Sequence, residues 1–207
     1  MADIVWVVRH GERRDSVDPD WESHADRLYD PPLTELGRWA AWRVGRRFAT
    51  AERSPDLVYA SPFLRTVETA VEICQETGNE ALLETGLSEH RNPEWFESDP
   101  ETVPPDVLAD RFAPVRPAHD SGVFPSFPET HAEAMDRIGA AARRLAEKRD
   151  GALLFVGHGV TVGGVARGLT GSAAAVDAPL CGLTRLDRTG DAWELSFSGD
   201  TSHLDSN

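Results

Sequence analysis

The chain has little cysteine, almost no lysine and no long hydrophobic run. Its 207 residues include two cysteines, Cys74 and Cys181, which lie far apart and follow neither a metal-ligand spacing nor a disulfide framework. Cys74 falls on the apolar face of an expected helix, so we expect it to pack in the core. No apolar stretch approaches the roughly 20 residues that a membrane span requires. These shortages exclude a disulfide scaffold, a cysteine-based metal site and a membrane-spanning protein.

The amino terminus carries no basic, apolar or cleavage segment of the kind that directs secretion, and it enters an expected strand almost at once. We therefore expect a cytoplasmic protein without a membrane partner. With 40% hydrophobic residues, the chain can form one globular domain over residues 1–207.

The charge of the chain is strongly negative. Asp and Glu number 35 against 21 Lys and Arg, which gives a net charge of −14, and Lys148 is the single lysine. Nucleic acid is excluded as a partner, because affinity for its phosphates depends on clustered cations. An acidic, lysine-poor chain is expected of a protein kept soluble in high salt or encoded by a GC-rich genome, and we favour the first hypothesis. A phosphorylated substrate is still compatible, since charges beyond about 8 Å are largely screened and nearby arginines dominate.

The chain opens with an apolar, β-branched run that stops abruptly at Arg9 and His10, and Gly11 then allows a sharp turn. In an α/β sheet, the free N–H groups of the next helix bind anions at such a strand end. Arginine offers a fork of donors suited to phosphate, and a neutral histidine is a nucleophile. The segment therefore indicates phosphoryl chemistry on His10. The alternative is a surface turn that holds a charged pair.

Two further strand ends resemble the first. The apolar run 152–156 is followed by His158 between two glycines, and the run 57–60 leads into Ser61, Pro62 and Arg65. We expect Ser61 to cap a helix that starts at Pro62. Convergence of the three strand ends would gather two imidazoles and two guanidiniums around one site.

Strand and helix patterns alternate along most of the chain. They predict a three-layer α/β/α sandwich with a mostly parallel sheet. Thr34 is expected to cap a helix with an apolar stripe through Leu36, Ala40, Val44 and Phe48, and Thr130 begins another helix with a capping box. Residues 182–187 and 192–197 are expected to form a hairpin in which one strand is antiparallel to the rest. The helix from Pro62 is expected to end near Gly78.

Residues 90–128 interrupt the alternation. They contain eight of the fourteen prolines together with several aromatic residues. Long segments with little periodicity inside a compact domain are usually functional, so we interpret this one as a lid-like insertion or substrate wall. The alternative is a loop that only covers the edge of the sheet.

Several motifs, taken in order, resemble the histidine phosphatase superfamily, the phosphoglycerate-mutase-like group. They are Arg9-His10-Gly11-Glu12, Asp30-Pro31-Pro32-Leu33-Thr34-Glu35-Leu36-Gly37, Ser61-Pro62-Phe63-Leu64-Arg65-Thr66-Val67-Glu68-Thr69-Ala70, Pro128-Glu129-Thr130 and Gly157-His158-Gly159. The Arg-His-Gly-Glu-Arg form with Arg13 is most similar to the branch that includes the phosphatase domains of the ubiquitin-associated SH3-containing signalling proteins.

The resemblance implies roles for individual residues. His10 would be the nucleophile and Glu89 the proton donor, with Glu94 as a competitor for the second role. A donor of this kind needs a raised pKa. The phosphate-binding residues implied are Arg9, Arg13, Arg65 and His158. No metal or other cofactor is implied. We expect surface or capping positions for His24, His90, His119, His131 and His203.

The function implied is that of a metal-independent, histidine acid phosphatase-type phosphomonoesterase that forms a phosphohistidine on His10. Its substrate would be a phosphorylated small molecule or a phosphoprotein. The alternatives are phosphoglycerate mutase-type transfer and a non-catalytic module that binds phospholigands. A metal-dependent hydrolase using His10, Glu12 and His158 is a more remote one. Sequence alone decides neither the substrate nor the oligomeric state.

Overall fold

A single mixed sheet forms the centre of the molecule in the computed structural model, which describes residues 1–117, 119–172 and 175–205. Position 118, inside the expected lid, is outside the described residues. The strands lie in the order β4-β3-β2-β5-β1-β6-β7. Their bounds are β1 Ala2–Arg9, β2 Leu57–Ala60, β3 Ala81–Leu83, β4 Val115–Arg116, β5 Gly151–Gly157, β6 Leu183–Thr189 and β7 Ala192–Asp200.

The sheet is mostly parallel. The five strands from β4 to β1 run in one direction, whereas β6 pairs antiparallel with β1 and β7 pairs antiparallel with β6. Gly190, with φ +64°, takes the left-handed conformation that the tight turn between β6 and β7 requires. The expected hairpin and its one reversed strand are therefore confirmed.

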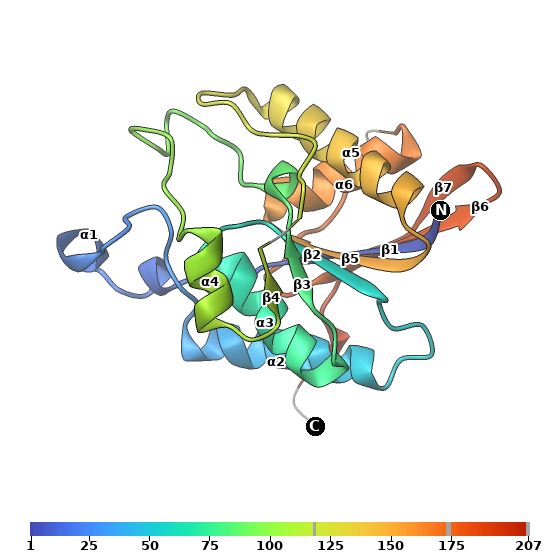
Figure 1. Ribbon diagram of the computed structural model, residues 1–207, viewed down its shortest axis with the longest axis horizontal. Coiled ribbons are helices and arrows are strands. Elements are labelled where there is room, and N and C mark those ends of the chain that lie inside the picture. The colour runs from blue at the N-terminus through green and yellow to red at the C-terminus, as the bar shows by residue number, and fades with distance from the viewer. Residues whose placement is uncertain (118, 173–174, 206–207) are drawn as a thin grey trace.

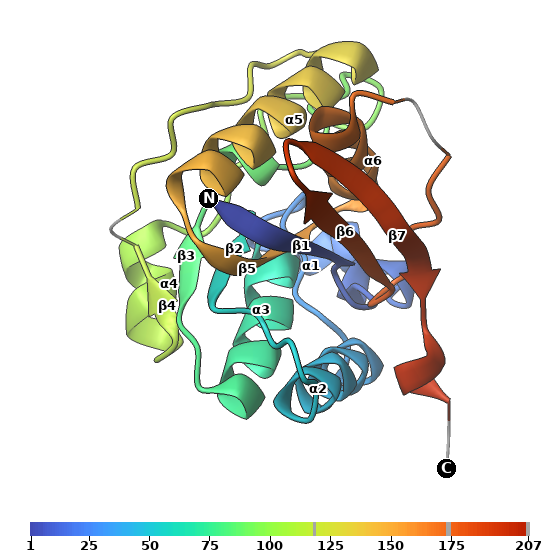
Figure 2. The same cartoon turned by 90° about the vertical axis from the view of Figure 1, so that its right-hand side faces the viewer.

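Two pairs of helices cover the two faces of the sheet (Figure 1, Figure 2). α2 (Glu35–Ala49) and α3 (Leu64–Thr77) pack on one face, and α5 (His131–Lys148) and α6 (Gly159–Thr170) pack on the other. Alternate residues of β1 enter the two cores, Trp6 on the first face and Val7 on the second. The three-layer α/β/α sandwich is confirmed.

One part of the proline-rich segment packs at the edge of the sheet, and another part lies near the site. α4 (Pro105–Arg111) and β4 form a small third core with α3, in which Leu108 and Val115 are fully buried. The stretch at 92–97 lies instead beside the loop that holds the short helix α1 (Trp21–His24). Part of residues 90–128 thus covers the sheet edge, and the lid role is a prediction for the rest.

The start of α3 differs from the sequence prediction. The helix begins at Leu64 rather than Pro62, and its first free N–H, on Leu64, donates to Asp30 Oδ1 at 2.6 Å. Asp30 comes from the loop after β1 and is only 2% exposed, so a distant carboxylate caps the helix. Ser61 is therefore not a cap. Its hydroxyl is directed elsewhere, as described below.

Other local predictions agree better. Thr34 accepts a hydrogen bond from Gly37 N and caps α2, the capping box of Thr130 and Glu133 is present, and Gly78 ends α3 in the left-handed conformation. Leu36, however, is 57% exposed, because the buried stripe of α2 runs through Ala41, Val44 and Phe48. Cys74 and Cys181 are both buried and free.

None of the helices in the described part of the chain is both long enough and apolar enough to cross a membrane.

Candidate active site

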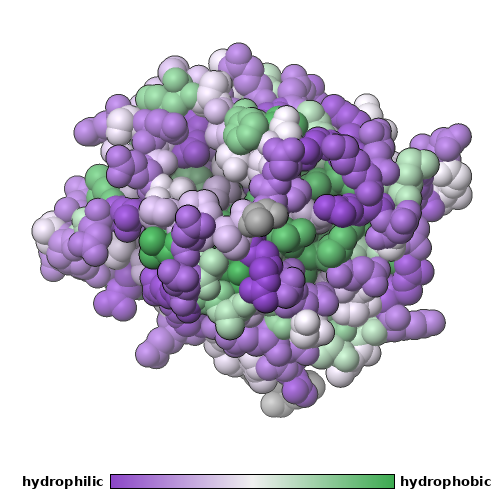
Figure 3. All heavy atoms as spheres, viewed as in Figure 1, coloured by the Kyte–Doolittle hydropathy of each residue, from purple (hydrophilic) through white to green (hydrophobic). Residues whose placement is uncertain are grey.

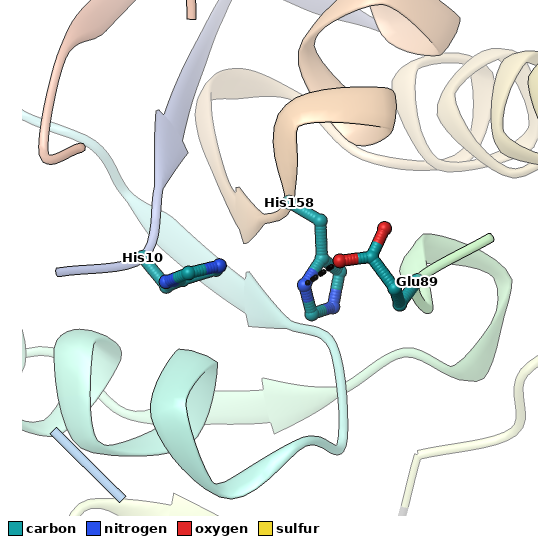
Figure 4. Close-up of side chains that lie close together, drawn as sticks. All are labelled: His10, Glu89 and His158. Carbon is teal, nitrogen blue, oxygen red and sulfur yellow. Dashed lines mark ion pairs between the residues drawn. The ribbon is translucent and has the colours of Figure 1, made fainter. Parts of the chain in front are cut away.

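The two expected site histidines lie next to each other because β1 and β5 are paired in register. Arg9 is opposite Gly157, and the backbone N–H of His10 donates to the Gly157 carbonyl at 2.9 Å. His10 and His158 are the next residues of the two strands. Their ring centroids are 5.5 Å apart, and both rings face the same space (Figure 4).

The ring of His10 is oriented by its own turn. Nδ1 lies 2.8 Å from the carbonyl oxygen of Gly11, to which it donates, so Nε2 keeps its lone pair. Burial, together with the charge of Arg65, holds the pKa of His10 well below its ordinary value. His10 is therefore neutral at physiological pH, the state that a nucleophile needs.

The turn after His10 depends on close backbone packing. A Cβ atom on Gly11 would lie 2.5 Å from the Gly37 carbonyl oxygen at the start of α2, which leaves no room for a side chain. The N–H of Gly11 donates to Thr69 Oγ1 of α3 at 3.1 Å. Both helices on this face of the sheet thus fix the direction of His10.

His158 is the N-cap of α6, and its N–H donates to Thr161 Oγ1 at 2.8 Å. Its Nδ1 is 3.2 Å from Glu89 Oε2, and its Nε2 is 2.9 Å from Ser61 Oγ. An Nδ1–H that donates to Glu89 leaves Nε2 to accept from the Ser61 hydroxyl. Burial lowers the pKa of His158 to about 4, although Glu89 acts in the opposite direction.

Ser61 is a site residue that the sequence analysis did not assign. It directly follows β2, just as His10 follows β1 and His158 follows β5, and it is fully buried. The position after a strand was therefore the signal that could have identified it. Because Ser61 was expected to cap a helix, its position after the strand was not interpreted as a site position.

Arg65 and Arg9 bring guanidinium groups to the same space. Arg65 is 1% exposed, and its Nη2 is 3.4 Å from Glu89 Oε2, whereas Arg9 Nη1 donates to the Ala178 carbonyl at 2.8 Å. The Nε atoms of both arginines are buried and have no hydrogen-bond partner among the described residues. Buried donors without a partner are costly, so an anion at this place would stabilise the site.

Burial also lowers the pKa of each guanidinium, to about 10 for Arg65, and both stay protonated at neutral pH. Arg13 adds to this effect, since its charge lowers the pKa of both Arg9 and Arg65. Arg13 itself is about a third exposed, and its Nε is 3.2 Å from Asp15 Oδ1. The third arginine thus lies at the rim with a carboxylate partner.

Glu89 joins the cluster as an ionised group, which differs from the expected raised pKa. Burial alone would raise the pKa of this carboxyl, but His158 and Arg65 beside it outweigh burial and hold the pKa well below its ordinary value. Glu94 is exposed and does not line the cavity that contains His10. Of the two candidate proton donors, only Glu89 lies within reach of the histidines.

A buried ion pair holds the loop that carries Glu89. Arg137 of α5 bonds both carboxylate oxygens of Glu129 and donates to the carbonyls of Gly86, Ser88 and Glu89 at 2.9, 3.2 and 3.3 Å. The Glu129 carboxylate in turn accepts from the N–H of Arg91 at 3.1 Å. The backbone is therefore fixed on both sides of Glu89.

The remaining histidines only partly follow the expectation of surface or capping positions. His24 and His131 are exposed. His90 and His203, by contrast, are buried and bond the carbonyls of Glu129 and Cys181 at 2.9 and 3.1 Å. The ring of His119 is 2.8 Å from Glu84 Oε2, with a side chain only 8% exposed. For these three the prediction was wrong, because backbone carbonyls and a buried carboxylate supply partners that a sequence does not reveal.

Metal-ligand atoms of His10, Glu89 and His158 lie within 4.8 Å of one another. The guanidiniums of Arg9 and Arg65 adjoin this group, so a cation would be repelled where an anion is attracted. Glu12 is not part of the group, since its carboxylate accepts from the Thr34 hydroxyl at 2.8 Å. The arrangement therefore suits phosphate better than a metal ion.

Arg9, His10, Arg13, Arg65 and Glu89 are among the residues that line an open cavity of about 720 Å³, and the buried His10 and Arg65 mark its floor. His158 is fully buried and is not among the lining residues. A cavity of this size accommodates a molecule much larger than phosphate.

The fold and the site define an α/β protein that brings imidazoles and guanidiniums together at the carboxyl edge of a mostly parallel sheet. The chain belongs to the histidine phosphatase superfamily (branch 1), whose family profile matches residues 5–201. The family resemblance of the sequence motifs is thereby confirmed.

Two curated proteins are similar to this chain over part of their own length. Ecdysteroid-phosphate phosphatase of Drosophila melanogaster is 28% identical over 203 residues, covering 88% of this chain and 26% of that protein. An uncharacterized phosphoglycerate mutase family protein of Acanthamoeba polyphaga mimivirus is 37% identical over 71 residues, covering 33% of this chain and 35% of that protein. The chain thus matches only about a quarter to a third of the length of these relatives.

Solved structures share the fold. Ecdysone phosphate phosphatase from Bombyx mori, in complex with tungstate, superposes with a TM-score of 0.77 at 24% identity, over 93% of this chain and 91% of that one. Mycobacterial glucosyl-3-phosphoglycerate phosphatase gives 0.68 at 22% identity, over 95% and 98%. Phosphoserine phosphatase from Entamoeba histolytica gives 0.65 at 18% identity, over 99% and 100%. The phosphoglycerate-mutase-like fold is confirmed by these neighbours.

Proposed function

We propose that this chain hydrolyses phosphomonoesters through a phosphohistidine on His10, without a metal ion. The single observation that carries the proposal is the hydrogen bond from His10 Nδ1 to the Gly11 carbonyl at 2.8 Å. It leaves Nε2 free to attack at the bottom of a cavity lined by guanidiniums. Relatives named for phosphatase activity on ecdysteroid phosphate, phosphoserine and glucosyl-3-phosphoglycerate support the reaction type and leave the substrate open.

In the first step, His10 Nε2 attacks phosphorus and forms the N–P bond while the P–O bond to the alcohol breaks. Arg9, Arg65 and His158 stabilise the charge on the three equatorial oxygens during the transfer. Glu89 gives its proton to the departing oxygen. The products of this step are the free alcohol and a phosphohistidine.

In the second step, water attacks phosphorus, and Glu89, now a carboxylate, takes the proton that the water loses. The N–P bond breaks and inorganic phosphate is released, which returns His10 to its neutral form. Glu89 thus regains the proton that it gave away, and no oxidant, metal or further reactant is needed.

The substrate itself reverses the ionisation of Glu89. In the free site Arg65 and His158 hold the pKa of this carboxyl low. A phosphate dianion occupies the Arg65 guanidinium and adds two negative charges beside the carboxylate, and both effects raise the pKa of Glu89. Glu89 therefore takes up a proton as the substrate binds.

The test uses p-nitrophenyl phosphate with EDTA present. We expect hydrolysis by the wild-type chain and none by His10→Ala, and we expect a phosphoprotein in rapidly quenched wild-type samples only. His24→Ala, which removes an exposed histidine, is the matched control and keeps full activity. Loss of activity in EDTA that zinc restores would instead support a metal-dependent hydrolase.

A further inference from the structure

The cavity extends well beyond its phosphate end, where polar residues such as Asp15, Ser16, His90 and His131 line it together with an apolar and aromatic wall. Two loops, α5, α6 and the segment before β6 contribute to this wall. Its residues include Tyr29, Trp95, Phe96, Met135, Val160 and Leu180. Because phosphate occupies only the floor, this wall faces the alcohol part of any bound ester.

The aromatic part of the wall is built where two loops meet. The rings of Tyr29 and Phe96 pack edge to face with centroids 5.1 Å apart, and the N–H of Glu97 donates to the Tyr29 hydroxyl at 3.2 Å. Trp95 is 57% exposed, with its ring 5.4 Å from that of His90. A large indole left open beside a catalytic cavity offers stacking area to an apolar ligand.

Positive charge is confined to the phosphate end. Among the described residues that line the cavity, the arginines are Arg9, Arg13 and Arg65, and the last lies at the floor. Arg13 already has Asp15 as a partner at 3.2 Å. No other lysine or arginine of the described chain lines this cavity, so a second anionic group on the substrate would lack a counter-charge.

Negative charge lies just outside the aromatic wall. A second hollow of about 550 Å³ shares Asp15, Leu28, Tyr29, Trp95 and Phe96 with the first. Besides Asp15, four further carboxylates line it, those of Asp18, Glu22, Glu94 and Glu97. Carboxylates this close to the wall repel an anionic substituent that extends past the aromatic rings.

We propose that the site selects phosphomonoesters of bulky, uncharged, aromatic or polycyclic alcohols and discriminates against esters that carry a second anionic group. This inference rests on the proposed phosphatase function. Selectivity comes from the alcohol part alone, since every such ester presents the same phosphate to the floor.

The test compares three aryl phosphates whose leaving groups have similar acidity: phenyl, 2-naphthyl and 4-carboxyphenyl phosphate. We expect kcat/KM for the naphthyl ester to exceed that for the phenyl ester by about tenfold, because an additional ring is buried against the wall. We expect kcat/KM for the carboxyphenyl ester to be about tenfold lower than that for the phenyl ester. 3-Phosphoglycerate, with its carboxylate close to the ester, should be hydrolysed more slowly still.

Two pairs of variants assign the preference to the wall. Trp95→Ala should remove most of the naphthyl advantage, whereas Trp39→Ala, on an exposed tryptophan of α2, should leave it intact. The double variant Glu94→Gln/Glu97→Gln should raise kcat/KM for the carboxyphenyl ester several-fold, and Glu52→Gln, at an exposed site outside both hollows, should not.

Binding to His10→Ala, measured by calorimetry, separates this inference from the proposed function. If naphthyl phosphate binds more tightly than phenyl phosphate but wild-type protein does not hydrolyse either, the proposed function fails and the binding preference stands. If both esters are hydrolysed at equal kcat/KM, or the carboxylated ester is preferred, the substrate class is overturned and the phosphatase remains. If neither ester binds to His10→Ala and wild-type protein hydrolyses neither, both are overturned.

Discussion

Glu89 has opposite electrostatic surroundings before and after a phosphate binds. In the free site this carboxylate pairs with the Arg65 guanidinium and accepts a hydrogen bond from Nδ1–H of the neutral His158, which together keep it ionised. In the proposed complex Arg65 turns to the phosphate, and the same carboxyl becomes an acid. One residue can therefore balance the charge of the empty site and supply the proton of the reaction.

The acidity of the leaving group determines how much protonation by Glu89 accelerates the reaction. We expect Glu89→Gln to slow hydrolysis of alkyl phosphates by about 10²–10⁴-fold, because an alkoxide needs protonation as it departs. For p-nitrophenyl phosphate, whose leaving group is stable without a proton, we expect a decrease of about tenfold or less. Steady-state kcat/KM values for the two ester classes provide the measurement, with Glu94→Gln as the control. Equal slowing of both classes would assign the proton to another residue.

His158 links the site to the stability of the fold. Its pKa of about 4 in the native state compares with about 6.5 for an unperturbed histidine, so between these pH values the unfolded chain binds a proton that the native one excludes. Stability from this residue is complete above pH 6.5 and is lost as pH falls toward 4. The free energy of unfolding should decrease by about 2 kcal/mol from pH 7 to 5 on this ground alone.

Urea denaturation of wild type and His158→Asn at several pH values measures that contribution. The difference between the two proteins should narrow as the pH falls from 7 to 5. His24→Ala, which removes an exposed ring, serves as the control for loss of a histidine outside the site. Parallel wild-type and His158→Asn curves would show that His158 does not resist protonation in the native state.

At the scale of whole elements, sequence reasoning succeeded where the signal was local. The strands that end at Arg9 and Gly157, and the helices capped by Thr34 and Thr130, follow from periodicity and capping residues that lie within a few positions of each other. The convergence of two histidines also followed, because parallel neighbours place their carboxyl ends at one edge.

The failures concern partners distant in sequence. Asp30 caps α3 from 34 residues away, which no local pattern at Ser61 could reveal. The ion pair of Arg137 and Glu129, which holds the loop of Glu89, likewise depends on how α5 packs against that loop. The pKa of Glu89 was expected to be raised because proton donation requires it, whereas Arg65 and His158 beside this carboxyl lower its pKa in the free site.

Removing only one partner of the Arg137–Glu129 ion pair is expected to destabilise the native state strongly. Arg137→Met leaves the Glu129 carboxylate, 4% exposed, without its partner and three loop carbonyls without their donor. We expect the free energy of unfolding to fall by about 3–5 kcal/mol, as measured by urea denaturation. The double variant Arg137→Met/Glu129→Gln should be more stable than the sum of the single variants predicts, because it leaves no buried charge. Additive losses would contradict the ion pair.

At the scale of the whole molecule, the net charge of −14 surrounds a site built for an anion. Hydrophilic residues cover most of the face in Figure 3, and hydrophobic residues appear as smaller patches. Exposed ion pairs, such as those of Arg46 with Glu76 and Arg53 with Asp3, add little to the stability of the native state because solvent screens them. Excess negative charge acts over the whole surface and opposes folding.

Added salt weakens both the attraction within surface ion pairs and the repulsion between excess carboxylates, and these changes have opposite effects on stability. We expect the weaker repulsion to dominate. Raising NaCl from 0.01 to 1 M shrinks the screening length from about 30 to 3 Å, which weakens repulsion between carboxylates more than it weakens the few surface pairs. We expect the free energy of unfolding to rise by about 2 kcal/mol, mostly below about 0.2 M, and kcat/KM for a dianionic ester to rise as well. Sodium sulfate, compared with chloride at equal ionic strength, separates screening from salting-out, which continues to increase at high concentration. Maximal stability and activity at the lowest salt would contradict both the self-repulsion argument and adaptation of this acidic surface to high salt.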